Sequence, residues 1–167
     1  MPNIEYIACD ESGLEQIADL WRKLQEHHRA CGGEFARTLG AVSWEQRKAG
    51  LLKKVVGGRL LVDVVRDGDA GRYVGYCVTS LTTELWGEIE SIYVEPEYRG
   101  EGIGDCLMRR ALAFLDEGGA KVKTLGVAVG NEEVFGFYRR YGFVPRATIL
   151  QQIEGLGRQG VVSPAGD

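Results

Sequence analysis

The chain has 167 residues, of which 44% are hydrophobic, and this length allows one domain whose core buries roughly two-thirds of the unfolded surface. A formal net charge of −4 and a sequence pI near 5.3 argue against a nucleic-acid-binding protein, which usually carries a basic excess. No apolar run approaches the length of a membrane span, and the N-terminal residues lack a signal-peptide pattern. We therefore expect a cytoplasmic protein that binds neither nucleic acid nor membrane.

The cysteines indicate neither a metal site nor a disulfide framework. Cys9, Cys31, Cys77 and Cys106 are far apart in the sequence, with no Cys-x-x-Cys pair and no histidine cluster beside them. We expect reduced, mostly packed thiols and no metal cofactor.

The N-terminal part predicts a strand followed by an amphipathic helix. Ile4 to Ala8 has strand character, and apolar residues then recur at helical spacing over Gly13 to Arg29. Ser12 is the predicted N-cap of this helix, with Glu15 at the capping-box position.

A second helix is predicted after a glycine-rich loop. Cys31 to Ala41 contains three glycines and is predicted to be a loop. From Ser43 to about Val55 the spacing is helical again, with Ser43 as N-cap and Gln46 three residues later.

The middle of the chain predicts three consecutive strands. Arg59 to Arg66 is rich in β-branched residues, and a turn signal at 67–71 leads into a second run, Tyr73 to Leu81. A third run extends over Gly87 to Val94. The first two are predicted to pair antiparallel.

A helix pattern begins after this third strand, with Leu107, Ala111, Phe114 and Leu115 as its buried stripe. Gly118 and Gly119 end it. The remaining pattern predicts a strand at Val122 to Val129, a short helix from Asn131 to Tyr141, and strand material at Phe143 to Ile153. From Gly155 onward the chain lacks periodicity and is predicted to be a flexible tail.

The most informative segment is the loop between the third strand and the long helix, Arg99-Gly100-Glu101-Gly102-Ile103-Gly104. Glycines at alternate positions allow backbone N–H groups to converge on an anion at a helix N-terminus. A plain tight turn is the simpler alternative. Two other phosphate loops are excluded, because no Gly-Lys-Ser/Thr follows and a dinucleotide fingerprint starting at Gly102 would need glycine in place of Leu107.

The form Arg99-x-x-Gly102-x-Gly104 after a strand resembles the characteristic motif of the GNAT superfamily of acyl-CoA-dependent N-acetyltransferases. Asn131 and the stretch Phe135 to Phe143 are similar to the second CoA-side segment of that family. The resemblance covers about Gly87 to Val144, and before it only the general layout matches.

The resemblance implies an α/β (α+β) fold with a mixed, mostly antiparallel sheet of about six to seven strands flanked by about four helices. A single N-acetyltransferase domain would occupy residues 1–154, with the tail at 155–167. The helix-loop-helix between the first two strands would cover the acceptor side. In the family a bulge in the third of the central strands opens the sheet beside it, which makes face assignments by simple alternation uncertain.

The resemblance also implies where acetyl-CoA binds as cosubstrate. The loop would hold the pyrophosphate through backbone amides, and the preceding strand edge would hydrogen-bond the pantetheine arm as an added strand would. Asn131 has two interpretations, a helix N-cap or a hydrogen-bond partner of the pantetheine. The predicted cofactor-binding residues are Ile92, Tyr93, Val94, Arg99, Gly100, Glu101, Gly102, Ile103, Gly104, Asn131 and Tyr138.

Two carboxylates on the third central strand are candidates for the base that deprotonates the amine. Glu88 and Glu90 share a face by strand alternation, and the context of Glu90 resembles the glutamate of polyamine-type family members, so Glu90 is preferred. A solvent-facing charge without a catalytic role, and water as the base, are the alternatives.

Tyr138 matches the family position of the phenol that protonates the departing CoA thiolate, and the alternative is a helix tyrosine that reaches solvent. Tyr93, Tyr98 and Tyr141 are interpreted as structural. His27 and His28 end an amphipathic helix, where the helix dipole explains them, and Cys106 is interpreted as packing.

One feature opposes phosphate binding, because Glu101 and Asp105 place negative charge beside the glycine loop. Tight binding then requires that both side chains point outward.

These observations predict an acetyl-CoA-dependent N-acetyltransferase that works by direct attack of a primary amine. A small amine such as a polyamine or aminoglycoside-like compound is the first choice of acceptor, and a protein N-terminus or lysine the second. The alternative is a non-catalytic acyl-CoA-binding sensor or interaction module. Monomer and homodimer are both open.

Overall fold

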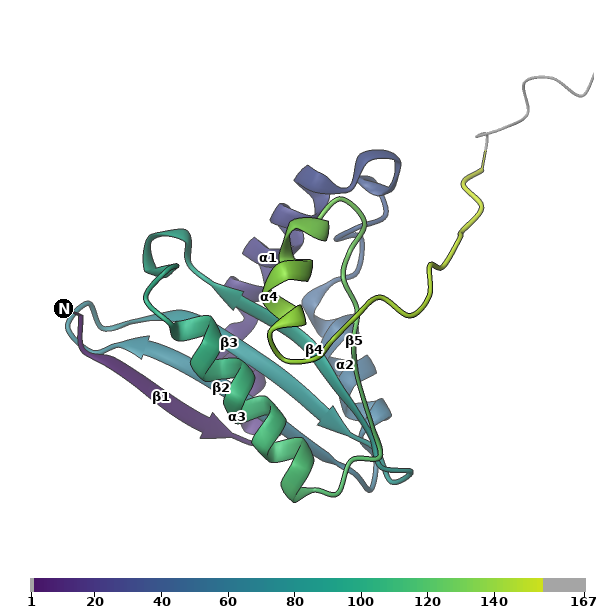
Figure 1. The fold of residues 1–167 in the computed structure, drawn as a ribbon. Helices are drawn as coiled ribbons and strands as arrows, with labels where there is room; N and C mark the ends of the chain where they lie inside the picture. The colour runs from purple at the N-terminus through teal and green to yellow at the C-terminus, as the bar shows by residue number, and fades with distance from the viewer. Residues whose placement is uncertain (1, 155–167) are drawn as a thin grey trace, which may run out of the picture. The chain divides into compact units, whose positions relative to one another are not determined.

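The computed structural model describes residues 2–154, and the predicted tail lies outside them. The chain divides into two compact units, Met1–Val134 and Phe135–Asp167, which are treated separately. The first unit contains a five-stranded sheet in the order β1-β2-β3-β4-β5 (Figure 1). The first four strands pair antiparallel with their neighbours, and the last is parallel to β4. The strands are β1 Ile4–Cys9, β2 Arg59–Asp67, β3 Arg72–Leu81, β4 Trp86–Val94 and β5 Val122–Leu125.

The mixed, mostly antiparallel α/β fold is confirmed, whereas the expected six to seven strands are five among the described residues. β5 ends at Leu125, and not at Val129. The expected strand at Phe143 to Ile153 is wrong, because these residues carry no strand and Ile149 and Leu150 are 92% and 91% exposed. A strand needs a neighbouring strand for its backbone groups, and the described residues from Phe135 onward contain none.

The helices follow the predicted order, with one difference at the first. The predicted helix at Gly13 to Arg29 begins as a 3-10 segment, Glu11–Ile17, and its cap is Asp10, whose side chain accepts from the Ser12 amide at 2.9 Å. The prediction of Ser12 as cap was wrong because the chain turns two residues earlier. The helices are α1 Ala18–Cys31, α2 Trp44–Lys54, α3 Ile103–Glu117 and α4 Phe135–Arg139, with short 3-10 segments at Gly33–Phe35, Pro96–Tyr98 and Glu132–Val134.

The start of α2 is as predicted. Ser43 accepts from the Gln46 amide at 3.2 Å, and the Gln46 side chain accepts from the Ser43 amide at 2.9 Å, which completes the capping box. This cap fixes where α2 begins and therefore which of its side chains face the sheet.

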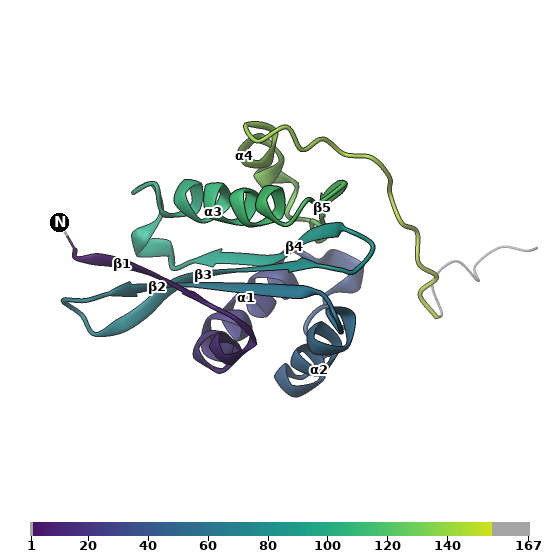
Figure 2. The ribbon, with the colours of Figure 1, turned by 90° about the horizontal axis from the view of Figure 1, so that it is seen from below.

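Helices cover both faces of the sheet in the first unit. Figure 2 shows α1 and α2 on one face and α3 on the other. Residues of α1, such as Trp21 and Leu24, form one apolar cluster with Val62, Tyr76 and Val78 of the sheet. The buried side of α3 consists of Ile103, Leu107, Met108, Ala111 and Leu115. Phe114, predicted for this stripe, is only half-buried.

A bulge interrupts β4 at Glu90. Val78 of β3 pairs with Ser91, and the next residue, Thr79, pairs with Ile89, so that Glu90 is left without a partner in the register. Pairing between β4 and β5 also ends at Ile89, opposite Leu125. The bulge predicted for this strand is thus confirmed, and it lies where β5 ceases to follow β4.

Candidate active site

The loop that follows β4 has the backbone of an anion site. Gly100 and Gly102 have φ angles of +84° and +79°, which non-glycine residues rarely adopt. A Cβ on either glycine would meet no atom of the described residues within 4 Å. The glycines therefore serve the backbone conformation and leave open space beside it.

The N-terminus of α3 lies immediately after these glycines. Gly102 is its N-cap and supplies no side-chain hydrogen bond. The first amides of a helix have no acceptor within the helix, and the helix dipole adds positive potential there. This terminus can accommodate a phosphate group.

Arg99 connects the loop to the end of β4. Its Nε donates to the Val94 carbonyl at 2.9 Å, and its guanidinium lies 5.7 Å from the centre of the Tyr93 ring. Glu101 is exposed, whereas Asp105 in the first turn of α3 is half-buried. Of the two carboxylates expected to oppose anion binding, Glu101 is therefore displayed to solvent, whereas Asp105 is only partly so.

The Glu90 carboxylate at the bulge is enclosed by donors, and its side chain is 3% exposed. Arg47 Nη2 donates to Glu90 Oε2 at 3.0 Å and to the Glu90 backbone carbonyl at 3.3 Å. Ser80 Oγ donates to Oε1 at 2.6 Å, and Lys54 Nζ donates to the same oxygen. One carboxylate thus joins α2, β3 and β4.

The charge state of Glu90 follows from these contacts. Burial by itself raises the pKa of Glu90, but hydrogen bonds from Lys54 and Ser80 and the charges of Lys54 and Arg47 outweigh it, so that the pKa is lowered. Burial likewise lowers the pKa of Lys54, yet its contacts with Glu88 and Glu90 leave that pKa raised. The glutamate is ionised and the lysine is protonated at neutral pH.

Glu88 shares this face with Glu90, as strand alternation predicted. Lys54 Nζ donates to Glu88 Oε2 at 2.6 Å as well as to Glu90. The Glu88 side chain is 30% exposed, ten times the exposed fraction of Glu90. The bulge therefore leaves both carboxylates on the side of α2 but in different environments.

Tyr93 is part of a second polar group on the same face. Its hydroxyl donates to Glu95 Oε2 at 3.0 Å, and Lys23 of α1 donates to Glu95 Oε1. Burial and the hydrogen bond to Glu95 raise the pKa of Tyr93 to about 12. These contacts support the structural interpretation of the Tyr93 side chain, whereas its backbone belongs to the open part of β4.

Asn131 has a partner that the sequence analysis missed. Its Oδ1 lies 3.1 Å from His27 Nε2, and because a carboxamide oxygen only accepts, the histidine donates. Cys31 Sγ lies 3.7 Å from the same nitrogen. Gly130 passes so close to Cys31 that a Cβ there would overlap its carbonyl oxygen. His27 therefore has a specific hydrogen-bond partner, which its position at the end of a helix does not by itself explain.

Tyr138 belongs to the second unit, where it lies in α4 and is half-buried. Its ring packs edge-on against Phe137, with the ring centroids 5.3 Å apart. Its backbone carbonyl accepts from the amides of Tyr141 and Phe143 at 3.0 and 3.3 Å. These contacts fix the C-terminal turn of α4.

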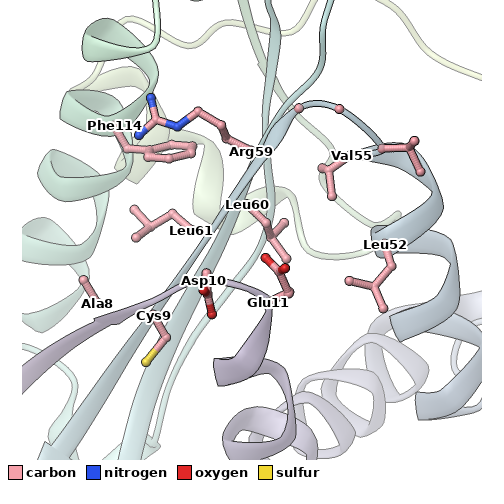
Figure 3. A pocket seen from close by; sticks show the side chains of 13 residues that line it. Ala8, Cys9, Asp10, Glu11, Leu52, Val55, Arg59, Leu60, Leu61 and Phe114 are labelled. Carbon is pink, nitrogen blue, oxygen red and sulfur yellow. The ribbon is translucent and has the colours of Figure 1, made fainter.

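A cavity of about 640 Å³ lies elsewhere in the first unit (Figure 3). Its wall includes Cys9 at the end of β1, Arg59 at the start of β2, and Phe114 near the C-terminal end of α3. Arg59 stacks on Phe114, 4.8 Å from the ring centre. The glycine loop adjoins the opposite end of α3, so this cavity is separate from the anion site.

The profile of the acetyltransferase (GNAT) family matches residues 21–143. The chain belongs to the GNAT family. The structure of a GCN5-related N-acetyltransferase from Ralstonia eutropha is 25% identical and aligns over 92% of this chain and all of that one, with a TM-score of 0.67. The PaiA N-acetyltransferase of Thermoplasma acidophilum, solved in complex with coenzyme A, shares the fold at 19% identity over 88% of this chain and 93% of its own, with a TM-score of 0.65.

Three curated relatives with named activities are similar to this chain. A putative ribosomal protein bS18-alanine N-acetyltransferase of Bacillus subtilis is 33% identical over 45% of this chain and 49% of its own length. A mycothiol acetyltransferase of Propionibacterium freudenreichii is 30% identical over 80% of this chain and 40% of its own length. A streptothricin acetyltransferase of Streptomyces lavendulae is 39% identical over 51% of this chain and 44% of its own. The chain thus spans less than half the length of each of these three relatives.

GNAT acetyltransferases use acetyl-CoA, and the open glycine loop with a helix N-terminus that has glycine as its N-cap fits a pyrophosphate group. Within residues 2–154 no group of three metal-ligating side chains comes together. In the same residues no helix combines the length and apolar character needed to span a bilayer.

Proposed function

We propose that this GNAT protein transfers an acetyl group from acetyl-CoA to a primary amine by direct attack. The observation that carries the proposal is the continuity of three features along β4. Its pairing with β5 ends at Ile89, the bulge follows at Glu90, and the strand then leads into the glycine loop and the N-terminus of α3, whose N-cap Gly102 makes no side-chain hydrogen bond. An unpaired strand edge beside an anion site suits a ligand that carries both amides and a pyrophosphate.

On the cosubstrate side, the residues act mainly through their backbones. The amides of Gly100 to Gly104 would bind the pyrophosphate, and the edge of β4 from Ile92 to Val94 would hydrogen-bond the pantetheine amides. Asn131, held by His27, would present its remaining carboxamide hydrogens to the same arm. Bound acetyl-CoA supplies the activated thioester carbonyl.

On the acceptor side, the incoming ammonium must lose a proton before its nitrogen can attack. The contacts of Glu90 weaken the case for it as the direct acceptor, because a lowered pKa makes it a weaker base and three side chains already donate to its oxygens. Glu88 is more exposed and has one cationic partner. We therefore propose that the proton leaves through Glu88 or water, with Glu90 as a fixed negative charge nearby.

Tyr138 is proposed to protonate the CoA thiolate when the tetrahedral intermediate collapses. The proposal rests on its position in the segment Phe135 to Phe143, which matches the family motif, and on the suitability of a phenol as donor to a departing thiolate.

For the acceptor we propose a small amine first and a protein N-terminus or lysine second. The net charge of −4 favours cationic acceptors, and two relatives, for mycothiol and streptothricin, bear names that refer to small molecules. The name of a third, a putative ribosomal-protein-alanine N-acetyltransferase, refers to a protein acceptor, which keeps a protein N-terminus as the second choice.

The test is the release of free CoA thiol from acetyl-CoA in the presence of a panel of polyamines, aminoglycosides, amino-sugar conjugates and short peptides. Turnover with one class identifies both the activity and the acceptor. Tight CoA binding by calorimetry without turnover on any amine would instead support the acyl-CoA-binding sensor.

A further inference from the structure

The two cations of α2 that contact Glu90 lie on one face of the helix, in its first turns and at its last residue. Arg47 and Lys54 are seven residues apart, close to two helical turns, so both side chains can reach the same strand. The residue they reach is the one that the β3–β4 register leaves without a partner. This convergence is independent of any bound ligand.

The bulge takes the backbone of Glu90 out of the β3–β4 pairing, so its carbonyl requires a donor from outside the sheet. A bulge residue interrupts the ladder, and its backbone carbonyl must find another donor when it is shielded from water. Arg47 Nη2 donates to that carbonyl at 3.3 Å and to the carboxylate of the same residue at 3.0 Å. A single guanidinium thus satisfies both the main chain and the side chain of Glu90.

Lys54 contributes from the other side of the carboxylate. It joins Glu90 to Glu88, two residues earlier on β4 and opposite Ser80 in the register. Because Glu90 is 3% exposed, loss of a cation would leave its charge buried with too few partners, which is costly. The same number of exposed ion pairs would contribute little.

We infer that Arg47 and Lys54 are positioning residues which clamp the Glu90 bulge to α2 and thereby fix the open edge of β4 from Ser91 to Val94. The inference rests on the proposed function, because that edge is where the pantetheine arm is proposed to bind. It assigns Glu90 the role of anchor, and it makes α2, a helix of the acceptor side, responsible for cosubstrate binding.

The test compares Lys54→Met with Lys53→Met, in which the neighbouring exposed lysine of the same helix is replaced. We expect Lys54→Met to raise KM for acetyl-CoA roughly tenfold with a much smaller change in kcat, because a loosened edge weakens binding more than chemistry. Lys53→Met should match the wild type. Arg47→Met should behave like Lys54→Met, and Arg47→Lys should restore part of the affinity.

The pH dependence separates a clamp from general loss of stability. The groups that face Glu90 are Arg47 and Lys54 from α2, Ser80 from β3 and Glu88 from its own strand. Burial raises the pKa of Glu90, and without Lys54 fewer contacts oppose that rise. Glu90 should therefore protonate at a higher pH and lose its ion pair with Arg47. As the pH is lowered, the KM for acetyl-CoA should therefore begin to rise at a higher pH in Lys54→Met than in the wild type.

Amide hydrogen exchange tests, without any ligand, whether Arg47 and Lys54 fix the edge of β4. Faster exchange at Ser91 to Val94 in Lys54→Met than in Lys53→Met supports the clamp, and equal exchange overturns it. A wild type that binds no CoA while the exchange difference is present overturns the proposed function alone. A wild type that turns over acetyl-CoA while both lysine variants share its KM and exchange overturns the clamp alone.

Discussion

The glycine loop and the Glu90 bulge both belong to the segment around the end of β4, yet they are stabilised in different ways. The loop takes its shape from its own residues, since two glycines with positive φ lead directly into α3. The bulge is held by side chains from α2, about forty residues earlier in the chain. The proposed anion site is thus encoded locally, whereas the bulge beside it depends on side chains from a distant helix.

Substitutions in these two regions should therefore impair the protein in different ways. Changes in the loop should act on ligand binding through backbone conformation, whereas changes around Glu90 should act through buried charge. The effects expected from each region therefore differ in kind as well as in size. Each can be tested with a control residue of the same type that lies at a different place in the structure.

The largest effect is expected on the chemistry of the departing thiolate. Tyr138→Phe removes one oxygen and keeps the ring that packs on Phe137. Loss of a general acid typically lowers turnover by about 10²- to 10⁴-fold. Acetyl-CoA affinity and the melting temperature should scarcely change, which steady-state kinetics, calorimetry and thermal unfolding can measure.

Tyr141→Phe is the matched control, because it removes the same oxygen three residues later in the same segment and should keep wild-type turnover. Full activity in Tyr138→Phe would assign Tyr138 a structural role. A loss of affinity equal to the loss of turnover would mean that its hydroxyl positions the cosubstrate.

The next effect concerns the loop, where Gly102→Ala should weaken CoA binding by roughly tenfold or more. Gly102 has φ +79°, so any side chain there strains the backbone by about 1–2 kcal/mol and also projects into the space where the anion would bind. The protein should therefore lose both stability and CoA affinity, measured by urea unfolding and calorimetry.

Gly119→Ala separates these two losses. Gly119 has φ +74° and equally open surroundings, but it follows the C-terminal end of α3. It should lose similar stability and no CoA affinity. If both variants bind CoA equally, the loop is a tight turn and the anion site lies elsewhere.

The loop could be predicted from the sequence because its signal is local. Glycines at alternate positions before a helix pattern indicate a turn with positive φ angles and are compatible with an anion site, and the capping box of Ser43 and Gln46 is an equally local signal. The bulge itself was expected only from the family resemblance. Its residue, Glu90, emerged from the pairing register.

The partners of the site residues could not be predicted, because they come from distant parts of the chain. Arg47 and Lys54 are ordinary cations of an amphipathic helix until its position over β4 is known. His27 and Asn131 are separated by 104 positions in the sequence. In the sequence, only the adjacent pair His27 and His28 hinted at this contact. The helix dipole already explained why two histidines lie at a helix end.

A smaller effect is expected on stability when the bulge loses its charge. Glu90→Gln should destabilise the protein by about 1–3 kcal/mol at pH 7, because Arg47 and Lys54 lose the charge of a buried partner. The lowered pKa of Glu90 means that its carboxylate stabilises the folded state above its ordinary pKa of about 4.5. That contribution is lost as the pH falls through the lowered value, so wild type and variant should converge in acid.

Glu88→Gln is the matched control for this prediction. Its carboxylate is 30% exposed and has Lys54 as its cationic partner, so the loss should stay below about 1 kcal/mol. Urea unfolding of the wild type and both variants from pH 7 to about pH 3 measures the difference. Equal losses at pH 7 would show that burial of Glu90 does not strengthen its ion pairs.

The smallest effect is expected at His27, which contacts Asn131, a residue proposed to bind the cosubstrate. His27→Ala removes the donor to Asn131 Oδ1, but the Asn131 backbone stays held by its bonds with Ala128 and Val134 at 3.1 and 3.3 Å. KM for acetyl-CoA should therefore rise only about two- to fivefold, or below about 1 kcal/mol, without a change in kcat.

His28→Ala is the control, since its side chain lies at the same end of α1 and its ring is 6.1 Å from that of His27. It should leave KM unchanged. Equal KM values for acetyl-CoA in His27→Ala and His28→Ala would mean that the hydrogen bond from His27 to Asn131 does not affect cosubstrate binding.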